Sequence, residues 1–448
     1  MDPEARFAIR PVKSPTRPEV ERDRDRLIHS AALRRLGGKS QIMSAPSGDY
    51  FRTRLTHSLE CAQIGRAIAS RVKSVHGGEV TTNPEDFPTV VEVGCLSHDL
   101  GHPPFGHNGE NALDHCMQRW ASRRFEGNAQ SLRVATWIEP KVTGPSQAGE
   151  ERWLGLDLTR ASLQALMKYT RRETEDMIIP GGEHPKHFKF GVFRSPRDLE
   201  YYDWIWKLNG DESTVPERSI AAAIVDTADD IAYAVHDLED GIWAGMIPLR
   251  ELVNGNEYAL DPVWRIVLER EQITDRQVFD ETIERLLRGI QDASWVKAAA
   301  AEDHMSRRAR SSLKTWASAL IDRYIHGCTD AGIFQEPTED HLNEISVLKA
   351  LAWRFMIDRP DMTAVKHGQR QVVEQLFDAY WNDPEMLPER IEHQEADLGE
   401  VDPASNSDTQ NELRARLICD HIASMTDRHC LAEHGRMFGG DAPFVLRM

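Results

Sequence analysis

The chain has 448 residues, of which 40% are hydrophobic and 28% are charged, so it can bury a large core and should be globular. Its 72 acidic residues outnumber the 54 basic ones and give a net charge of −18. This excess argues against a general nucleic-acid binder, because such proteins need surplus Lys and Arg to displace the counterions of the phosphate backbone. It does not exclude a local basic pocket for a polyphosphate.

The six cysteines show no CxxC spacing, so we expect reduced thiols rather than a disulfide framework. The first residues are charged and lack the apolar stretch of a signal peptide. No apolar run approaches the length that is needed to span a bilayer. These features predict a soluble, cytoplasmic protein.

Apolar residues recur at helical spacing along most of the chain, which predicts an all-α fold with no clear domain boundary. Residues 393–410 are polar and aperiodic, which indicates a surface loop. In chain order, the pattern predicts helices over 24–36, 53–76, 158–169, 219–240, 277–290, 307–326, 341–357, 365–381 and 411–437, and one short strand near 188–193.

The pair His98-Asp99 stands where an apolar run breaks into a loop rich in Gly, Pro and His. Together with His57 upstream and Asp229 downstream, this pair predicts one divalent-metal site. Imidazole and carboxylate ligands suit Mn, Fe or Ni, or Mg with additional waters. Four protein ligands leave positions open for water and a phosphate oxygen, which is typical of a hydrolase rather than of a structural site.

The helix predicted over 219–240 is apolar on nearly every side, so a carboxylate at Asp229 is costly unless it is paired or binds a metal. Asp229, Tyr233 and Asp237 are spaced i, i+4 and i+8 and therefore share one face. The alternative is a helix whose carboxylates form interhelical salt bridges. The neighbouring His-Asp motif makes the metal site the stronger interpretation.

His107 and Glu110 lie at i, i+3 and could form a general acid with its orienting partner. For His102, a role in shaping the loop and a functional role are equally compatible with the sequence. His57 could be a core histidine on an amphipathic helix. The nearby Arg54 favours a phosphate-facing end instead, because guanidinium groups suit phosphate oxygens.

An ordered series of segments spans nearly the whole chain: LRRLGGKSQI (33–42), RTRLTHSLECAQIGRAIA (52–69), HDLGHPPFGHNGE (98–110), FEGNAQSLR (125–133), LTRASLQALMKY (158–169), KFGVF (189–193), DTADDIAYAVHDLEDG (226–241) and MTDRHCLAEHGRMFG (425–439). As a set, these segments resemble the HD-domain deoxynucleoside triphosphate triphosphohydrolases, the dGTPase-like family. One departure is Gly37-Gly38, which follows Arg-Arg-Leu where many relatives have Gln.

The resemblance implies one all-α domain over 1–448, with an HD core at about 50–245 and additional C-terminal helices at about 246–448. It implies metal-dependent hydrolysis of dGTP or other dNTPs to a deoxynucleoside and tripolyphosphate. It also implies a homo-oligomer (tetramer or hexamer), a second dNTP as a candidate activator, and weak single-stranded DNA binding. By motif position, the metal ligands would be His57, His98, Asp99 and Asp229, the general acid would be His107 supported by Glu110, the phosphate contact would be Arg54, and the sugar contacts would be Tyr233 and Asp237.

Two alternatives remain open at the level of sequence. One is an HD phosphohydrolase of nucleoside monophosphates or guanosine tetraphosphate, against which the segments LGGKSQI, FEGNAQ and MTDR argue, since smaller HD enzymes would not need them. The other is a nucleotide-binding or single-stranded-DNA-binding regulator, against which the complete ligand set argues. Base preference, the physiological metal and the cellular role are not specified by the residues.

Overall fold

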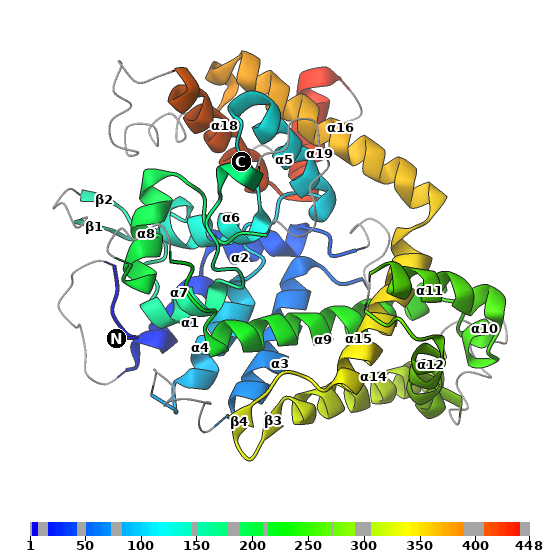
Figure 1. Cartoon of the computed structure of the whole chain (residues 1–448). Coiled ribbons are helices and arrows are strands. Elements are labelled where there is room, and N and C mark those ends of the chain that lie inside the picture. Colours follow the sequence, from blue (N-terminus) through cyan, green and yellow to red (C-terminus); the bar gives the residue numbers. More distant parts are fainter. Residues whose placement is uncertain are drawn as a thin grey trace. The chain divides into compact units, whose positions relative to one another are not determined.

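The computed structural model describes residues 2–7, 17–42, 51–72, 83–145, 151–177, 189–208, 214–270, 272–291, 306–388 and 407–439 (Figure 1). Helices dominate these ranges, and the predicted all-α fold is confirmed. Residues 1–62, 81–225 and 366–448 form a first compact unit, and residues 63–80 and 226–365 form a second. The single domain with an HD core and a C-terminal region stays a prediction.

The predicted helices are present with different ends, and the helices over residues 87–97, 107–121, 127–133, 196–206, 249–253 and 257–269 were not predicted. In chain order the helices are α1 (Glu19–Ile28), α2 (Ala31–Arg35), α3 (Arg54–Ala69), α4 (Phe87–Ser97), α5 (His107–Ala121), α6 (Gly127–Arg133), α7 (Arg160–Leu166), α8 (Pro196–Trp206), α9 (Ile220–Trp243), α10 (Leu249–Val253), α11 (Glu257–Glu269), α12 (Arg276–Gln291), α14 (Arg307–Gly327), α15 (Glu339–Ala352), α16 (Pro360–Asn382), α18 (Ser407–Ala423) and α19 (Asp427–Phe438). Short 3₁₀ or π segments occupy Leu36–Gly38, Val134–Ile138, Glu175–Met177, Trp353–Ile357 and Pro384–Met386.

Two predicted helices are each divided by a capping residue. The helix predicted over 24–36 is α1 and α2, because the Ser30 side chain accepts a hydrogen bond from Leu33 N at 3.1 Å and starts a new helix. The helix predicted over 411–437 is α18 and α19, where Thr426 accepts from His429 N at 3.2 Å. Ser and Thr satisfy the exposed amides of a helix start in this way.

Two small antiparallel hairpins were not predicted: β1 (Thr143–Pro145) pairs with β2 (Glu151–Trp153), and β3 (Thr329–Asp330) pairs with β4 (Ile333–Phe334). The strand expected near 188–193 is wrong over its described part, residues 189–193. There the chain forms an isolated bridge between Arg172 and Val192 instead. Most of the loop predicted over 393–410 lies outside the described residues.

Helix α4 explains the apolar run before His98. It packs against α1 and α7, and nearly all of its side chains are buried. A Cβ added at Gly94 would lie 2.8 Å from Val225 Cγ2 and 2.9 Å from Ala165 Cβ, so only a glycine permits this close approach. His98-Asp99 therefore follows directly after a tightly packed helix.

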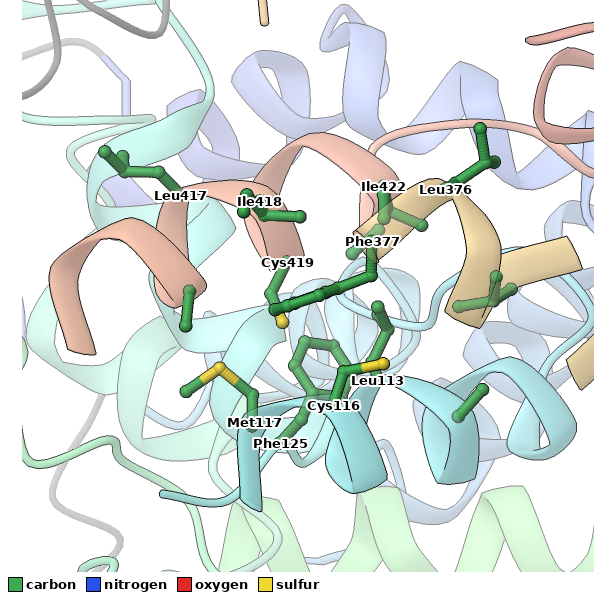
Figure 2. Close-up of a cluster of buried hydrophobic side chains, with 14 of the residues drawn as sticks. Leu113, Cys116, Met117, Phe125, Leu376, Phe377, Leu417, Ile418, Cys419 and Ile422 are labelled. Carbon is green, nitrogen blue, oxygen red and sulfur yellow. The ribbon is translucent and has the colours of Figure 1, made fainter. Parts of the chain in front are cut away.

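A second core of the first unit lies between α5, α16 and α18 (Figure 2). Leu113, Cys116 and Met117 of α5 face Phe377 of α16 and Cys419 of α18. All six cysteines of the chain are buried free thiols. Among the described helices, none is both long enough and apolar enough to cross a membrane.

Candidate metal and proton-transfer site

His57 is placed by the start of α3. Its backbone amide donates to Thr53 O at 3.0 Å, and Thr53, which directly precedes α3, forms an isolated antiparallel bridge with Ser40. Arg54 N also donates to Lys39 O at 3.1 Å. Both His57 and Arg54 are buried, so this helix start directs an imidazole and a guanidinium into the first unit rather than into solvent.

His98 follows the last residue of α4, and its ring orientation is fixed by a backbone contact. Its Nδ1 lies 2.6 Å from the carbonyl oxygen of Cys95. Because a carbonyl can only accept, Nδ1 carries the proton and Nε2 presents its lone pair to the site. This is the tautomer in which a histidine binds a metal through Nε2 while its other nitrogen is held by the protein.

His57, His98 and Asp99 form one group whose candidate ligand atoms all lie within 4.8 Å of one another. The His57 and His98 ring centroids are 5.6 Å apart, and all three residues are buried. Metal–ligand bonds of about 2.0–2.2 Å require only a small contraction of this group around an ion. The two nitrogens, the carboxylate and the His98 tautomer therefore fit a first-row divalent metal.

Asp99 is held as a carboxylate. Burial opposes its charge, but Arg54, with Nη1 at 2.7 Å from Asp99 Oδ2, and the surrounding histidines keep the pKa of Asp99 well below its usual range. Gly106 gives the guanidinium its space, because a Cβ there would lie 2.8 Å from Arg54 Nη2. The predicted phosphate-binding residue thus contacts a predicted metal ligand, and its contact with phosphate stays a prediction.

Asp229, Tyr233 and Asp237 lie on the part of α9 that belongs to the second unit. Asp229 and Tyr233 are half-buried, and Asp237 is buried. The apolar surroundings expected for this helix are present, since most of its Ile, Val, Leu and Ala side chains are buried. The assignments of Asp229 as a fourth ligand and of Tyr233 and Asp237 as sugar contacts stay predictions.

His107 and Glu110 form the predicted pair in the first turn of α5. Nδ1 of His107 lies 2.8 Å from Glu110 Oε2, with 70% of the histidine side chain exposed and the carboxylate buried. Glu110 Oε1 accepts from Gly127 N at 3.0 Å and from Lys189 Nζ at 3.3 Å. Burial would raise the pKa of Glu110, but Lys189 and the hydrogen bond with His107 hold it well below its usual range. Glu110 is therefore a carboxylate that orients an exposed imidazole.

His102 lies between the two groups. Its Nδ1 is 3.1 Å from Asp99 Oδ1, and burial, aided by the charge of Arg54, holds its pKa well below the usual value. Candidate ligand atoms of His102, His107 and Glu110 also lie within 4.8 Å of one another. Because Lys189 already neutralises Glu110, a cation is disfavoured there, and the arrangement suits proton transfer better than a second metal.

Three charged residues near the site were missed by the sequence reasoning. Lys189 connects Glu110 with Glu126 Oε1, which lies 2.8 Å from its Nζ. Lys39 donates to the carbonyl oxygens of His102 and Ala423, and Asp427 accepts from two backbone amides. The segments that contain them were recognised, but their partners are far away in the sequence, and no spacing indicates such contacts.

Comparison with known proteins agrees with this geometry. Residues 54–140 match the HD domain, and residues 336–436 match the phosphohydrolase-associated domain. A deoxyguanosinetriphosphate triphosphohydrolase-like protein of Bifidobacterium longum is 36% identical over 96% of this chain and 85% of its own length. Its counterparts in Streptomyces coelicolor and Corynebacterium glutamicum (strain R) are each 35% identical, over 97% and 92% of this chain and 96% and 89% of their own lengths. The chain therefore belongs to the deoxyguanosinetriphosphate triphosphohydrolase-like family of HD-domain phosphohydrolases, with a divalent metal as its cofactor.

Proposed function

We propose that the protein is a metal-dependent triphosphohydrolase that cleaves dGTP or other dNTPs to the deoxynucleoside and tripolyphosphate. The observation that carries this proposal is the juxtaposition of the His57–His98–Asp99 group with the His107–Glu110 pair in one unit. The first offers a metal site, and the second offers a proton donor. The names of the relatives support a nucleoside triphosphate as substrate.

In this proposal His57, His98, Asp99 and Asp229 hold the ion, as Mn, Mg, Fe or Ni. When bound, the metal would neutralise charge on the α-phosphate and lower the pKa of a bound water. A cation beside Asp99 would compete with Arg54 for that carboxylate, whose Oδ2 is now 2.7 Å from Arg54 Nη1. The displaced guanidinium could then bind a phosphate oxygen.

His107 is the proposed general acid. Its Nδ1–H is held by Glu110 Oε2, so a proton on Nε2 can be delivered to the departing 5′ oxygen. The buried carboxylate orients the imidazole, and the exposed ring is accessible to a bound nucleotide. Tyr233 and Asp237 are proposed to approach the sugar.

The test is anion-exchange analysis of the products formed from each of the four dNTPs and from GTP, with Mn²⁺ or Mg²⁺. Deoxynucleoside together with tripolyphosphate supports the proposal and ranks the bases. Products that contain only phosphate or pyrophosphate would indicate a different HD phosphohydrolase.

Further measurements test the proposals that the protein is a tetramer or hexamer and that a second dNTP activates it. Turnover of dNTP mixtures but not of single dNTPs would indicate an activator site, and light scattering measures the oligomer. Weak single-stranded DNA binding is tested by fluorescence anisotropy.

Asp229→Ala tests the fourth ligand, and Asp230→Ala is its matched control. Asp230 is the next residue of α9, and Lys349 Nζ contacts its Oδ1 at 2.5 Å. We expect Asp229→Ala to lose turnover while still binding nucleotide, and Asp230→Ala to keep both. Full activity in Asp229→Ala would remove it from the ligand set.

A further inference from the structure

Three segments that are distant in the sequence meet beside the proposed general acid. They are Lys39-Ser40, the loop 102–106 that leads into α5, and the turn between α18 and α19. All three belong to the first unit. The loop lies in the part that matches the HD domain, and the turn lies in the part that matches the phosphohydrolase-associated domain.

Asp427, the first residue of α19, contacts two of these segments with different oxygens. Oδ1 accepts from Phe105 N at 2.9 Å, and Oδ2 accepts from Ser40 N at 3.0 Å and from Ser40 Oγ. Backbone amides cannot move independently of their chain, so both oxygens fix main-chain positions. The carboxylate therefore connects α19 with the loop and with the segment that precedes α3.

Lys39 also connects the loop 102–106 with the end of α18. Its Nζ donates to His102 O at 2.6 Å and to Ala423 O at 2.8 Å, and the residue is only 1% exposed. Its own backbone oxygen accepts from Arg54 N. Lys39 and Asp427 thus hold both ends of the loop 102–106 against the α18–α19 turn.

The loop needs such support because its conformation is unfavourable. Phe105 has a φ of 64°, in the left-handed region that a non-glycine residue rarely adopts, and Gly106 follows with a φ of 59°. Such a conformation persists only where the surroundings determine it. The amide of Phe105 is the group that Asp427 binds, and His107 begins α5 two residues later.

We infer that Asp427 is a positioning residue, which fixes the loop 102–106 and thereby the direction from which His107 reaches the substrate. The end of the phosphohydrolase-associated region is then part of the machinery of the HD domain. This inference rests on the proposed function for its effect on turnover. The placement of the loop can be measured independently of turnover.

The experiment compares Asp427→Ala, Asp427→Asn and the control Glu433→Gln. Glu433 lies on the same helix, where it pairs with Arg436 and His429. The asparagine keeps one acceptor oxygen, whereas Phe105 N and Ser40 N require two. Hydrogen exchange in the full chain should show faster exchange of the Phe105 amide in Asp427→Ala, faster exchange of either the Phe105 or the Ser40 amide in Asp427→Asn, and no change in the control.

Steady-state kinetics with dGTP and Mn²⁺ should show a kcat lowered about 10- to 100-fold in Asp427→Ala, with a smaller change in KM, because misplacing a catalytic group slows the chemical step. Mn²⁺ binding, measured by calorimetry, should change less than about twofold. A double-mutant cycle with His107→Ala separates a specific effect from a general one. If Asp427 acts through His107, its substitution should have little effect once His107 is absent.

Equal losses in both backgrounds, or unchanged exchange at Phe105 in Asp427→Ala, would overturn the inference. If Asp427→Ala does not fold, Asp427→Asn carries the same cycle. If the wild-type protein releases no tripolyphosphate, the proposed function fails, while hydrogen exchange still decides whether Asp427 holds the loop.

Discussion

Substitution of Gly38 tests the contact between residues 36–38 and the start of α19 by its effect on stability, without an activity assay. A Cβ added there would lie 2.7 Å from Thr426 Cγ2 and 2.9 Å from Thr426 Cβ, whereas a Cβ at Gly37 would meet its nearest neighbour, Leu55 Cδ2, at 3.5 Å. The first contact is far inside van der Waals distance, and the second is ordinary. Gly38→Ala must therefore push α19 away, while Gly37→Ala fits the existing space.

The two substitutions have the same effect on the unfolded chain and different effects on packing in the folded protein. Both reduce the freedom of the unfolded chain, which stabilises the protein by about 0.4–1 kcal/mol in each case. Overpacking at Gly38 costs about 1–3 kcal/mol more. Because the effect on the unfolded chain cancels, Gly38→Ala should be less stable than Gly37→Ala by about 1–3 kcal/mol. With an unfolding entropy of about 0.9 kcal/mol/K for a chain of this length, the difference in Tm is about 1–3 °C.

Differential scanning calorimetry of both variants at one protein concentration measures this difference. Adding Thr426→Ser to Gly38→Ala removes the methyl group at 2.7 Å and keeps the hydroxyl that caps α19, so part of the stability should return. A Gly38→Ala protein as stable as Gly37→Ala would refute the close packing of residues 36–38 against the start of α19.

Other predictions concern the metal, the acid and the buried lysine. Free Mn²⁺ at 100 times its Kd should raise the free energy of unfolding by about 2.7 kcal/mol relative to protein in the presence of a chelator. Thermal unfolding of His98→Ala should show no such gain, and an equal gain in that variant would place the ion elsewhere. His107→Ala should lower kcat at least about 10²-fold and Glu110→Gln about 10- to 100-fold, and changes confined to KM would contradict an acid role. Burial lowers the pKa of Lys39 from 10.5 to about 7, so between these values the folded protein binds fewer protons than the unfolded chain and its stability rises with pH. Urea unfolding from about pH 7 to about pH 9.5 should show the wild type gaining stability relative to Lys39→Met, and a difference that does not vary with pH would disprove the shift.

Local patterns were the part of the site that could be predicted from the sequence. His107 and Glu110 are one helical turn apart, and the structure brings them together as their spacing indicates. His57 joins His98 and Asp99, as the choice of ligand types suggested. The first contact follows from a short motif, and the second follows from the ligand chemistry of the side chains.

The long-range hydrogen bonds and ion pairs around the site were not predictable in this way. Ser40 and Asp427 are 387 residues apart, and neither spacing nor composition indicates that they meet. The pairing of Arg54 with Asp99 was missed because guanidinium groups suit carboxylates and phosphates equally well. The helix breaks at Ser30 and Thr426 were missed for another reason. Ser and Thr are recognised helix caps, but the apolar periodicity continues on either side of each residue and obscured the break.

The buried thiols have a consequence for the protein's response to oxidants and alkylating reagents. Burial raises the pKa of Cys328 to about 12 and holds those of Cys116, Cys419 and Cys430 well above the usual value. Because the thiolate is the reactive form, these side chains are protected twice, by their inaccessibility and by their protonation. Cys116 and Cys419 lie within the core between α5 and α18 (Figure 2), so a reagent reaches them only when that core opens. The rate at which Cys116 and Cys419 are modified in native buffer thus reports how often α5 and α18 separate.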